Sequence, residues 1–133
     1  MFAQILGYYV PYSGSVGPRV RVLEPGHAEV EIPDRRSNRQ HLGSVHAIAL
    51  ANAAELASGL AMLVGLPDGI RGIVVDLSIQ YFKKARGTIR AVSTVVVPTV
   101  TTGTDLTITA DCLDSGRELV ARATVRWRLA PEP

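Results

Sequence analysis

Apolar and polar side chains alternate along most of this chain, which is the pattern of β-strands that bury one face and expose the other. Alternation around Val20 and Val22, and again from Ala28 to Ile32, predicts two strands joined as a hairpin by a tight turn. Four further strands are predicted over residues 73–81, 88–97, 106–112 and 119–129. In the first of these four, one predicted face carries Ile73, Val75, Leu77, Ile79 and Tyr81.

Residues 46–64 have a different pattern, because they are apolar on nearly every side and rich in alanine. A helix of this kind is a core element and not a surface one. It is also the only large apolar element that could cover the apolar face of the predicted sheet. The sequence therefore predicts an antiparallel sheet that wraps around this helix.

The remaining segments complete the predicted fold. Residues 34–45 are polar and predict a loop, and helical spacing near the N-terminus predicts a short amphipathic helix that Pro11 ends. The residues that carry this spacing are Phe2, Ile5, Leu6, Tyr9 and Val10. The predicted fold class is α+β, as a single domain over residues 1–133, with one central long helix, a wrapping antiparallel sheet and a short N-terminal helix.

Composition restricts the function classes. Hydrophobic residues make up 47% and charged residues 20% of the chain, which is typical of a globular protein. The net charge is only +2 and aromatic residues are 5%, which argues against a nucleic-acid partner. No segment reads as a signal peptide or a membrane span, so no membrane association is expected.

The cysteine and histidine residues predict neither a disulfide nor a metal site. Cys112 is alone, so an internal disulfide is excluded, and a cysteine in a strand pattern is typical of a small core residue. The expected compartment is the reducing cytoplasm. His27 and His41 have no partners at ligand spacing, so no metal site is expected.

Residues 40–55, QHLGSVHAIALANAAE, form a polar, glycine-broken stretch that runs directly into the predicted helix. This segment resembles the active-site motif of the hotdog-fold acyl-CoA thioesterases of the PaaI type. That motif has Asn or Gln, two residues, Gly, two residues, His-Gly-Gly, and then an acidic residue on the helix. Four residues fall at those spacings: Gln40, Gly43, His46 and Glu55. Ala47-Ile48 replaces the two glycines, so the chain resembles a divergent member of the superfamily.

The resemblance implies a hotdog fold and assigns the chemistry. Glu55 is expected to act as base or nucleophile, and the amide of Ala47 at the helix start is expected to stabilise the oxyanion of the thioester. Gln40 is expected to orient the thioester or the attacking water, and His46 to organise the loop or cap the helix. An amide donates whatever its side chain, so Ala47 keeps this role, whereas Ile48 is expected to narrow the space that glycine leaves for substrate.

The spacing along the helix has a consequence for assembly. His46 and Glu55 are nine residues apart, which places them on opposite sides of a helix and about 13 Å apart along its axis. One chain therefore cannot bring its helix start and its Glu55 to a single carbonyl, whereas a two-fold dimer can. The resemblance accordingly implies a homodimer with two shared sites, or a dimer of such dimers.

Further residues are expected to contact the substrate. Gly43 belongs to the motif, and Asn52 and Ser58 share a helical stripe with Glu55. Lys83, Lys84 and Arg86 follow a strand that in the family runs beside the site, so they are expected to contact the phosphates of CoA. A solvated strand end is the alternative for these three residues. CoA enters as part of the substrate, and no separate cofactor is expected.

Three functions remain open at this point. The first is an acyl-CoA thioesterase that acts on medium, long or aryl acyl groups. The second is a non-catalytic acyl-CoA-binding module, which the loss of both motif glycines favours. The third is an acyl-thioester dehydratase or hydratase, which would need a His-rich, proline-rich loop or an Asp-x-Asn-x-x-His element that is not readable in the sequence.

Overall fold

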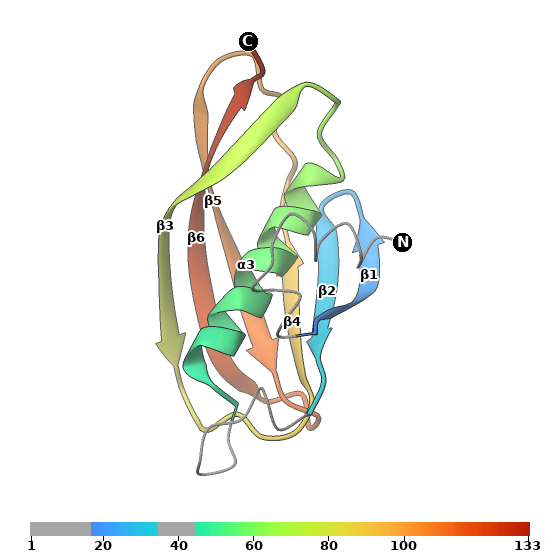
Figure 1. Cartoon of the computed structure of the whole chain (residues 1–133), viewed down its shortest axis with the longest axis vertical. Helices are drawn as coiled ribbons and strands as arrows, with labels where there is room; N and C mark the ends of the chain where they lie inside the picture. Colours follow the sequence, from blue (N-terminus) through green and yellow to red (C-terminus); the bar gives the residue numbers. More distant parts are fainter. Residues whose placement is uncertain (1–16, 35–44) are drawn as a thin grey trace.

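The computed structural model describes residues 17–34 and 45–133. In these ranges the elements are β1 (Arg19–Glu24), β2 (His27–Ile32), α3 (Ala47–Leu63), β3 (Ile70–Tyr81), β4 (Ile89–Thr94), β5 (Thr104–Leu113) and β6 (Leu119–Pro131). The strands form one antiparallel sheet in the order β1-β2-β4-β5-β6-β3. Helix α3 lies across one face of the curved sheet (Figure 1). The predicted order of hairpin, helix and four strands is confirmed, whereas the predicted helix near the N-terminus lies outside the described residues.

The contact between α3 and the sheet is built from small side chains. The helix packs chiefly against β2, β4 and β5. Alanines are buried on both sides of this contact, namely Ala49, Ala53, Ala54, Ala57 and Ala61 on α3 and Ala28, Ala91, Ala110 and Ala123 on the strands. Small side chains let the helix and the sheet approach closely and still fill the space between them. The prediction that this alanine-rich helix is a core element is confirmed.

Gly26 joins three elements at the turn of the β1–β2 hairpin. Its φ is +84°, a conformation that favours glycine, and an added Cβ would lie 2.7 Å from the carbonyl oxygen of Val95. Its amide donates to the carbonyl of Ala61 on α3 at 2.8 Å, and its carbonyl accepts from the amide of Val95 at 2.8 Å. The hairpin turn is thereby fixed to both the helix and the end of β4.

Strand β3 departs from the simple alternation that the sequence predicts. A bulge between Val74 and Asp76 shifts its register against β6. Val74, before the bulge, and Leu77, after it, both pack against the core. Ile73, which the alternation placed on the same face as Leu77, is instead 60% exposed. The prediction for Ile73 is wrong because the extra residue of the bulge reverses the facing of the first part of the strand.

Cys112 is a core residue, as predicted. It is fully buried, and its thiol contacts the carbonyl oxygen of Leu50 at 3.7 Å. Burial raises the pKa of this thiol to about 12, so it stays protonated at neutral pH. Within the described ranges, no helix has the length and hydropathy needed to cross a bilayer.

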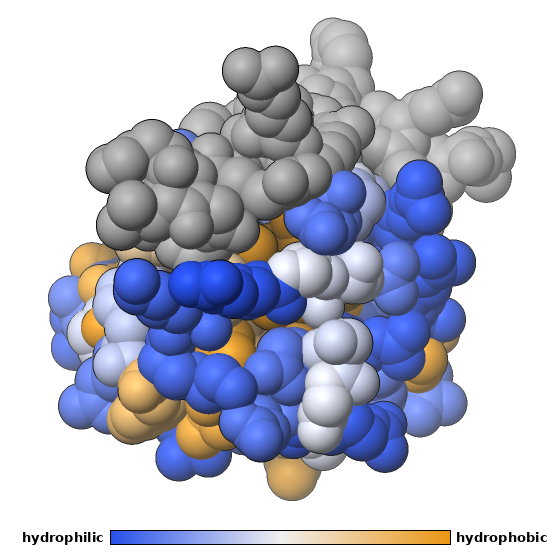
Figure 2. Space-filling model, turned by 90° about the horizontal axis from the view of Figure 1, so that it is seen from below, coloured by the Kyte–Doolittle hydropathy of each residue, from blue (hydrophilic) through white to orange (hydrophobic). Residues whose placement is uncertain are grey.

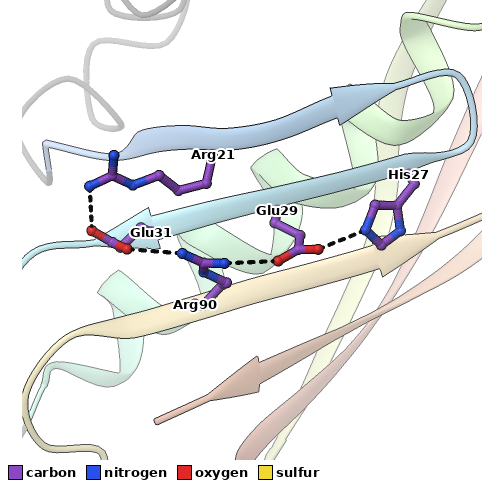
Figure 3. A network of polar contacts seen from close by, with 5 residues as sticks. All are labelled: Arg21, His27, Glu29, Glu31 and Arg90. Carbon is purple, nitrogen blue, oxygen red and sulfur yellow. Dashed lines mark hydrogen bonds and ion pairs between the residues drawn. The ribbon is translucent and has the colours of Figure 1, made fainter. Parts of the chain in front are cut away.

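The outer face of the sheet, away from α3, carries a chain of ion pairs across β1, β2 and β4 (Figure 3). Arg90 bonds both Glu29 at 3.1 Å and Glu31 at 3.3 Å, and Glu31 also bonds Arg21 at 2.9 Å. A hydrogen bond of 2.9 Å between the His27 ring and the carboxylate of Glu29 continues the chain. The bond from His27 lowers the pKa of Glu29, and the bond from Arg21 lowers the pKa of Glu31. The charges on this face therefore satisfy one another.

Candidate active site

The start of α3 offers free hydrogen-bond donors. His46 precedes the helix with an extended backbone, at φ −57° and ψ 139°, and makes no side-chain cap. The first helical bond runs from the amide of Leu50 to the carbonyl of His46 at 3.1 Å. The amides of Ala47, Ile48 and Ala49 precede this bond, so they have no partner within the helix. No acidic residue occupies the first turn, so the positive end of the helix dipole is not neutralised there.

Glu55 lies in a groove between α3 and β3. The groove has a volume of about 300 Å³ and is lined by Ile48, Ala51, Asn52, Glu55, Val74 and Leu77. The Glu55 carboxyl is half-buried, and burial raises its pKa. Within the described part of the chain it forms no ion pair. A carboxylate in an apolar groove without a cation beside it is a candidate proton acceptor or nucleophile.

The two candidate groups are far apart within one chain. Ala47 and Glu55 are eight residues apart on α3, which is about 12 Å along the helix axis. Ile48, by contrast, is seven residues from Glu55 and lies on the same helical face, where its side chain is 66% exposed. Within one chain, the carboxylate and the helix start are therefore two separate groups that cannot meet at one atom of a substrate.

The end of β3 and the segment after it hold the helix start in place. The hydroxyl of Tyr81 donates to the carbonyl oxygen of Ala47 at 3.0 Å. The amide of Val45 donates to the carbonyl oxygen of Ala85 at 2.7 Å. Sequence reasoning missed the role of Tyr81, because its partner is 34 residues away and no local pattern marks the contact.

Ser58 does not lie in the groove with Glu55. It is fully buried, accepts a hydrogen bond of 3.1 Å from the indole nitrogen of Trp127, and donates one of 2.7 Å to the carbonyl of Glu55. The predicted substrate contact by Ser58 is therefore corrected to a core contact within the protomer. Asn52 lines the groove beside Glu55, as its place on the predicted stripe requires.

The three basic residues after β3 differ from one another. Lys83 is bound to Asp114 at 3.0 Å and also to Glu118, so its charge is already paired. Lys84 and Arg86 are exposed and form no ion pair with a described residue. The bond between Val45 and Ala85 places both of them next to the helix start. This end of the molecule is largely hydrophilic on the surface that can be seen (Figure 2).

Gln40 and Gly43 lie outside the described residues, so their predicted roles stay predictions.

A second hollow lies on the other side of the sheet. It has a volume of about 370 Å³ and is lined by Glu29, Glu31, Arg90 and neighbouring residues. Its carboxylates are paired with cations, and it opens on the face away from α3 and Glu55. Within the described ranges, no three acidic, histidine or cysteine side chains are grouped closely enough to hold a metal ion.

Comparisons with known proteins agree with this architecture. A family model described as a domain of unknown function (DUF4442) matches residues 1–129. A comparison with the sequences of curated proteins gave no significant match. Among solved structures, the structural genomics target APC5556 is 34% identical, with a TM-score of 0.85, over 98% of this chain and 88% of its own.

Two further solved structures carry a name. PA5026 from Pseudomonas aeruginosa, a protein of unknown function and probable thioesterase, is 23% identical, with a TM-score of 0.86, over 98% of this chain and 95% of its own. A mutant of the phenylacetic acid degradation protein PaaI from Thermus thermophilus is 22% identical, with a TM-score of 0.74, over 89% of this chain and 97% of its own. The sheet wrapped around α3 is therefore the hotdog fold that thioesterases share.

Proposed function

The chain belongs to the DUF4442 family, described as a domain of unknown function, and from the fold it shares with thioesterases we propose that it hydrolyses acyl-CoA thioesters. One observation carries the proposal. The half-buried carboxylate of Glu55 lies in an apolar groove where no described residue places a cation beside it, and the same helix starts with amides that no described side chain caps. Thioester hydrolysis needs both a proton acceptor or nucleophile and an oxyanion donor.

The chemistry can follow either of two routes. As a base, Glu55 takes a proton from water while the water oxygen bonds to the thioester carbon, and the C–S bond then breaks to release CoA as the thiolate. As a nucleophile, a Glu55 oxygen bonds to the carbon and releases CoA first, and water then cleaves the resulting anhydride. On both routes the negative charge on the carbonyl oxygen is stabilised by the amides at a helix start.

A two-fold dimer completes this site. Because Glu55 and Ala47 of one chain are about 12 Å apart, Glu55 pairs with the helix start of a second copy. The outer edge of β3 has no neighbouring strand in the described sheet, and Ile48 and Ile73 expose apolar surface on α3 and β3. These features support an interface along β3 and α3. Gln40 orients the thioester or the water in this proposal.

The first test is a screen of acyl-CoA thioesters with straight, branched and aryl acyl groups, repeated with Glu55→Gln. The substitution keeps the shape of the side chain and removes its ability to accept a proton or attack. We expect kcat to fall by at least about a hundredfold. Glu24→Gln, on an exposed glutamate of β1, is the matched control and should keep the parent rate. A folded Glu55→Gln protein that hydrolyses its best thioester at the parent rate would refute the catalytic role.

The second test asks whether the site is shared. Glu55→Gln removes the carboxylate and Ala47→Pro removes the amide N–H at the helix start. A dimer made of either variant alone should therefore be inactive. A mixed dimer would hold one site with both defects and one site with none. Random mixing should therefore restore about a quarter of the parent activity per chain. No recovery after verified subunit exchange would place both groups in one chain and contradict the dimer.

A non-catalytic acyl-CoA-binding module is the second candidate, and Ile48 favours it. Its exposed side chain stands at the helix start, where the motif has a glycine and the substrate approaches closely. Thermal stabilisation by acyl-CoA without any release of free CoA would favour this candidate over the hydrolase.

A further inference from the structure

The hydrogen bond from Tyr81 acts on a peptide group at the helix start. The carbonyl of Ala47, which accepts this bond at 3.0 Å, belongs to the same peptide plane as the amide N–H of Ile48. That N–H is one of the donors that precede the first helical bond of α3. A bond to the carbonyl end of a peptide fixes its plane and polarises its N–H, because successive hydrogen bonds strengthen one another.

Strand β3 runs from the groove beside Glu55 to the start of α3 at Ala47. Leu77 lines the groove beside Glu55, and Tyr81 lies four residues further along the strand, at about 13 Å. On the helix, Glu55 and Ala47 are about 12 Å apart. The two distances are nearly equal and the two elements run antiparallel, so the same strand contacts both the groove beside Glu55 and the helix start. The bond from Val45 to Ala85 also fixes the chain two residues before the helix begins.

We infer that Tyr81 is a positioning residue, which holds the Ala47–Ile48 peptide so that the Ile48 amide donates to the thioester oxyanion together with the Ala47 amide. This inference rests on the proposed thioesterase function. Tyr81 touches no reacting atom and acts only through the peptide. Its hydroxyl remains a donor at neutral pH, because burial raises the pKa of the phenol.

The test combines kinetics with NMR on Tyr81→Phe, which removes only the hydroxyl. The 13C resonance of the Ala47 carbonyl and the 15N resonance of the Ile48 amide report on the bond directly. Phe82→Leu is the control, because Phe82 is an adjacent exposed aromatic residue without a hydroxyl. We expect both resonances to move in Tyr81→Phe and not in Phe82→Leu. We also expect kcat to fall about three- to tenfold with KM unchanged, since the oxyanion bond forms in the transition state.

The outcomes separate this inference from the proposed function. Unmoved resonances, or an unchanged kcat in an active enzyme, would overturn the positioning role. If no thioester is hydrolysed at all, the proposed function fails, while the resonances still show whether the bond from Tyr81 exists. Should Tyr81→Phe not fold, 3-fluorotyrosine labelling of the parent chain makes the phenol a stronger donor. The Ala47 carbonyl resonance should then move, and its failure to move would likewise overturn the inference.

Discussion

The indole nitrogen of Trp127 on β6 donates a hydrogen bond of 3.1 Å to the hydroxyl of Ser58 on α3. Both side chains are buried, and Gly59 next to Ser58 leaves room for the indole, since an added Cβ would lie 2.9 Å from the ring. The Ser58 hydroxyl in turn donates to the carbonyl of Glu55 at 2.7 Å. The helix turn that carries Glu55 is thus fixed to the sheet from the inside of the core.

Replacing Ser58 by alanine should lower the free energy of unfolding by about 1–3 kcal/mol, because the buried indole N–H loses its acceptor. Urea denaturation measures the change, and Ser78→Ala, at an exposed serine of β3, is the control. In a protein that also carries Trp127→Phe, Ser58→Ala should lower the free energy of unfolding by less, because no indole N–H remains that needs an acceptor. A Ser58→Ala protein as stable as the parent would show that the bond contributes nothing.

The sequence predicted most of the fold because period-two alternation and an apolar helix are strong signals. It did not predict the bulge in β3, although Ile73, Val74 and Val75 are three consecutive apolar residues that interrupt the alternation. A bulge at this point lets Val74 and Leu77 face the core together. Ile73 was misassigned for that reason.

The sequence could predict only those site residues that a short local motif marks. The spacing of the motif singles out Ala47 and Glu55, and Glu55 lines the groove between α3 and β3, whereas the catalytic roles of both residues stay predictions. The helical stripe also included Ser58, because a helical wheel does not show that an indole from β6 fills the space beside it. The partners of Tyr81 and Lys83 are 34 and 31 residues away in the chain, so their contacts leave no local pattern.

Glu55→Gln should stabilise the fold at neutral pH. Burial raises the pKa of Glu55, so the folded state favours the protonated carboxyl and loses stability as the pH rises through the folded pKa. Below the ordinary value of 4.5 the carboxyl is protonated in both states, and the two proteins should have similar melting temperatures. At a pH of about 7.5 the glutamine variant should melt higher. An equal difference in melting temperature under acidic and neutral conditions would contradict this account, and Glu24→Gln serves as the control.

Lys84 and Arg86 should contribute to binding of the CoA part of the substrate. The double variant Lys84→Ala/Arg86→Ala should raise KM for acyl-CoA about tenfold at low salt, because two charge-assisted contacts to phosphate are lost. KM for the matching N-acetylcysteamine thioester, which has no phosphates, should not change. Lys83→Ala is the control, since Lys83 is already paired with Asp114 and Glu118. If the parent and the double variant have equal KM values, Lys84 and Arg86 do not contact CoA and belong to a solvated strand end.

Ile48 should set the size of the acyl group. Its side chain lines the groove on the same helical face as Glu55, so Ile48→Ala opens space beside the carboxylate. Because a single methylene in an apolar pocket changes kcat/KM by about 10- to 200-fold, the ratio of kcat/KM for branched or aryl acyl-CoA over short straight-chain acyl-CoA should rise at least about tenfold. Val96→Ala is the control, because Val96 is also an exposed aliphatic residue but lies outside the groove and outside the proposed interface along β3 and α3. If the ratio stays constant in Ile48→Ala, or rises equally in Val96→Ala, the groove beside Glu55 does not hold the acyl group.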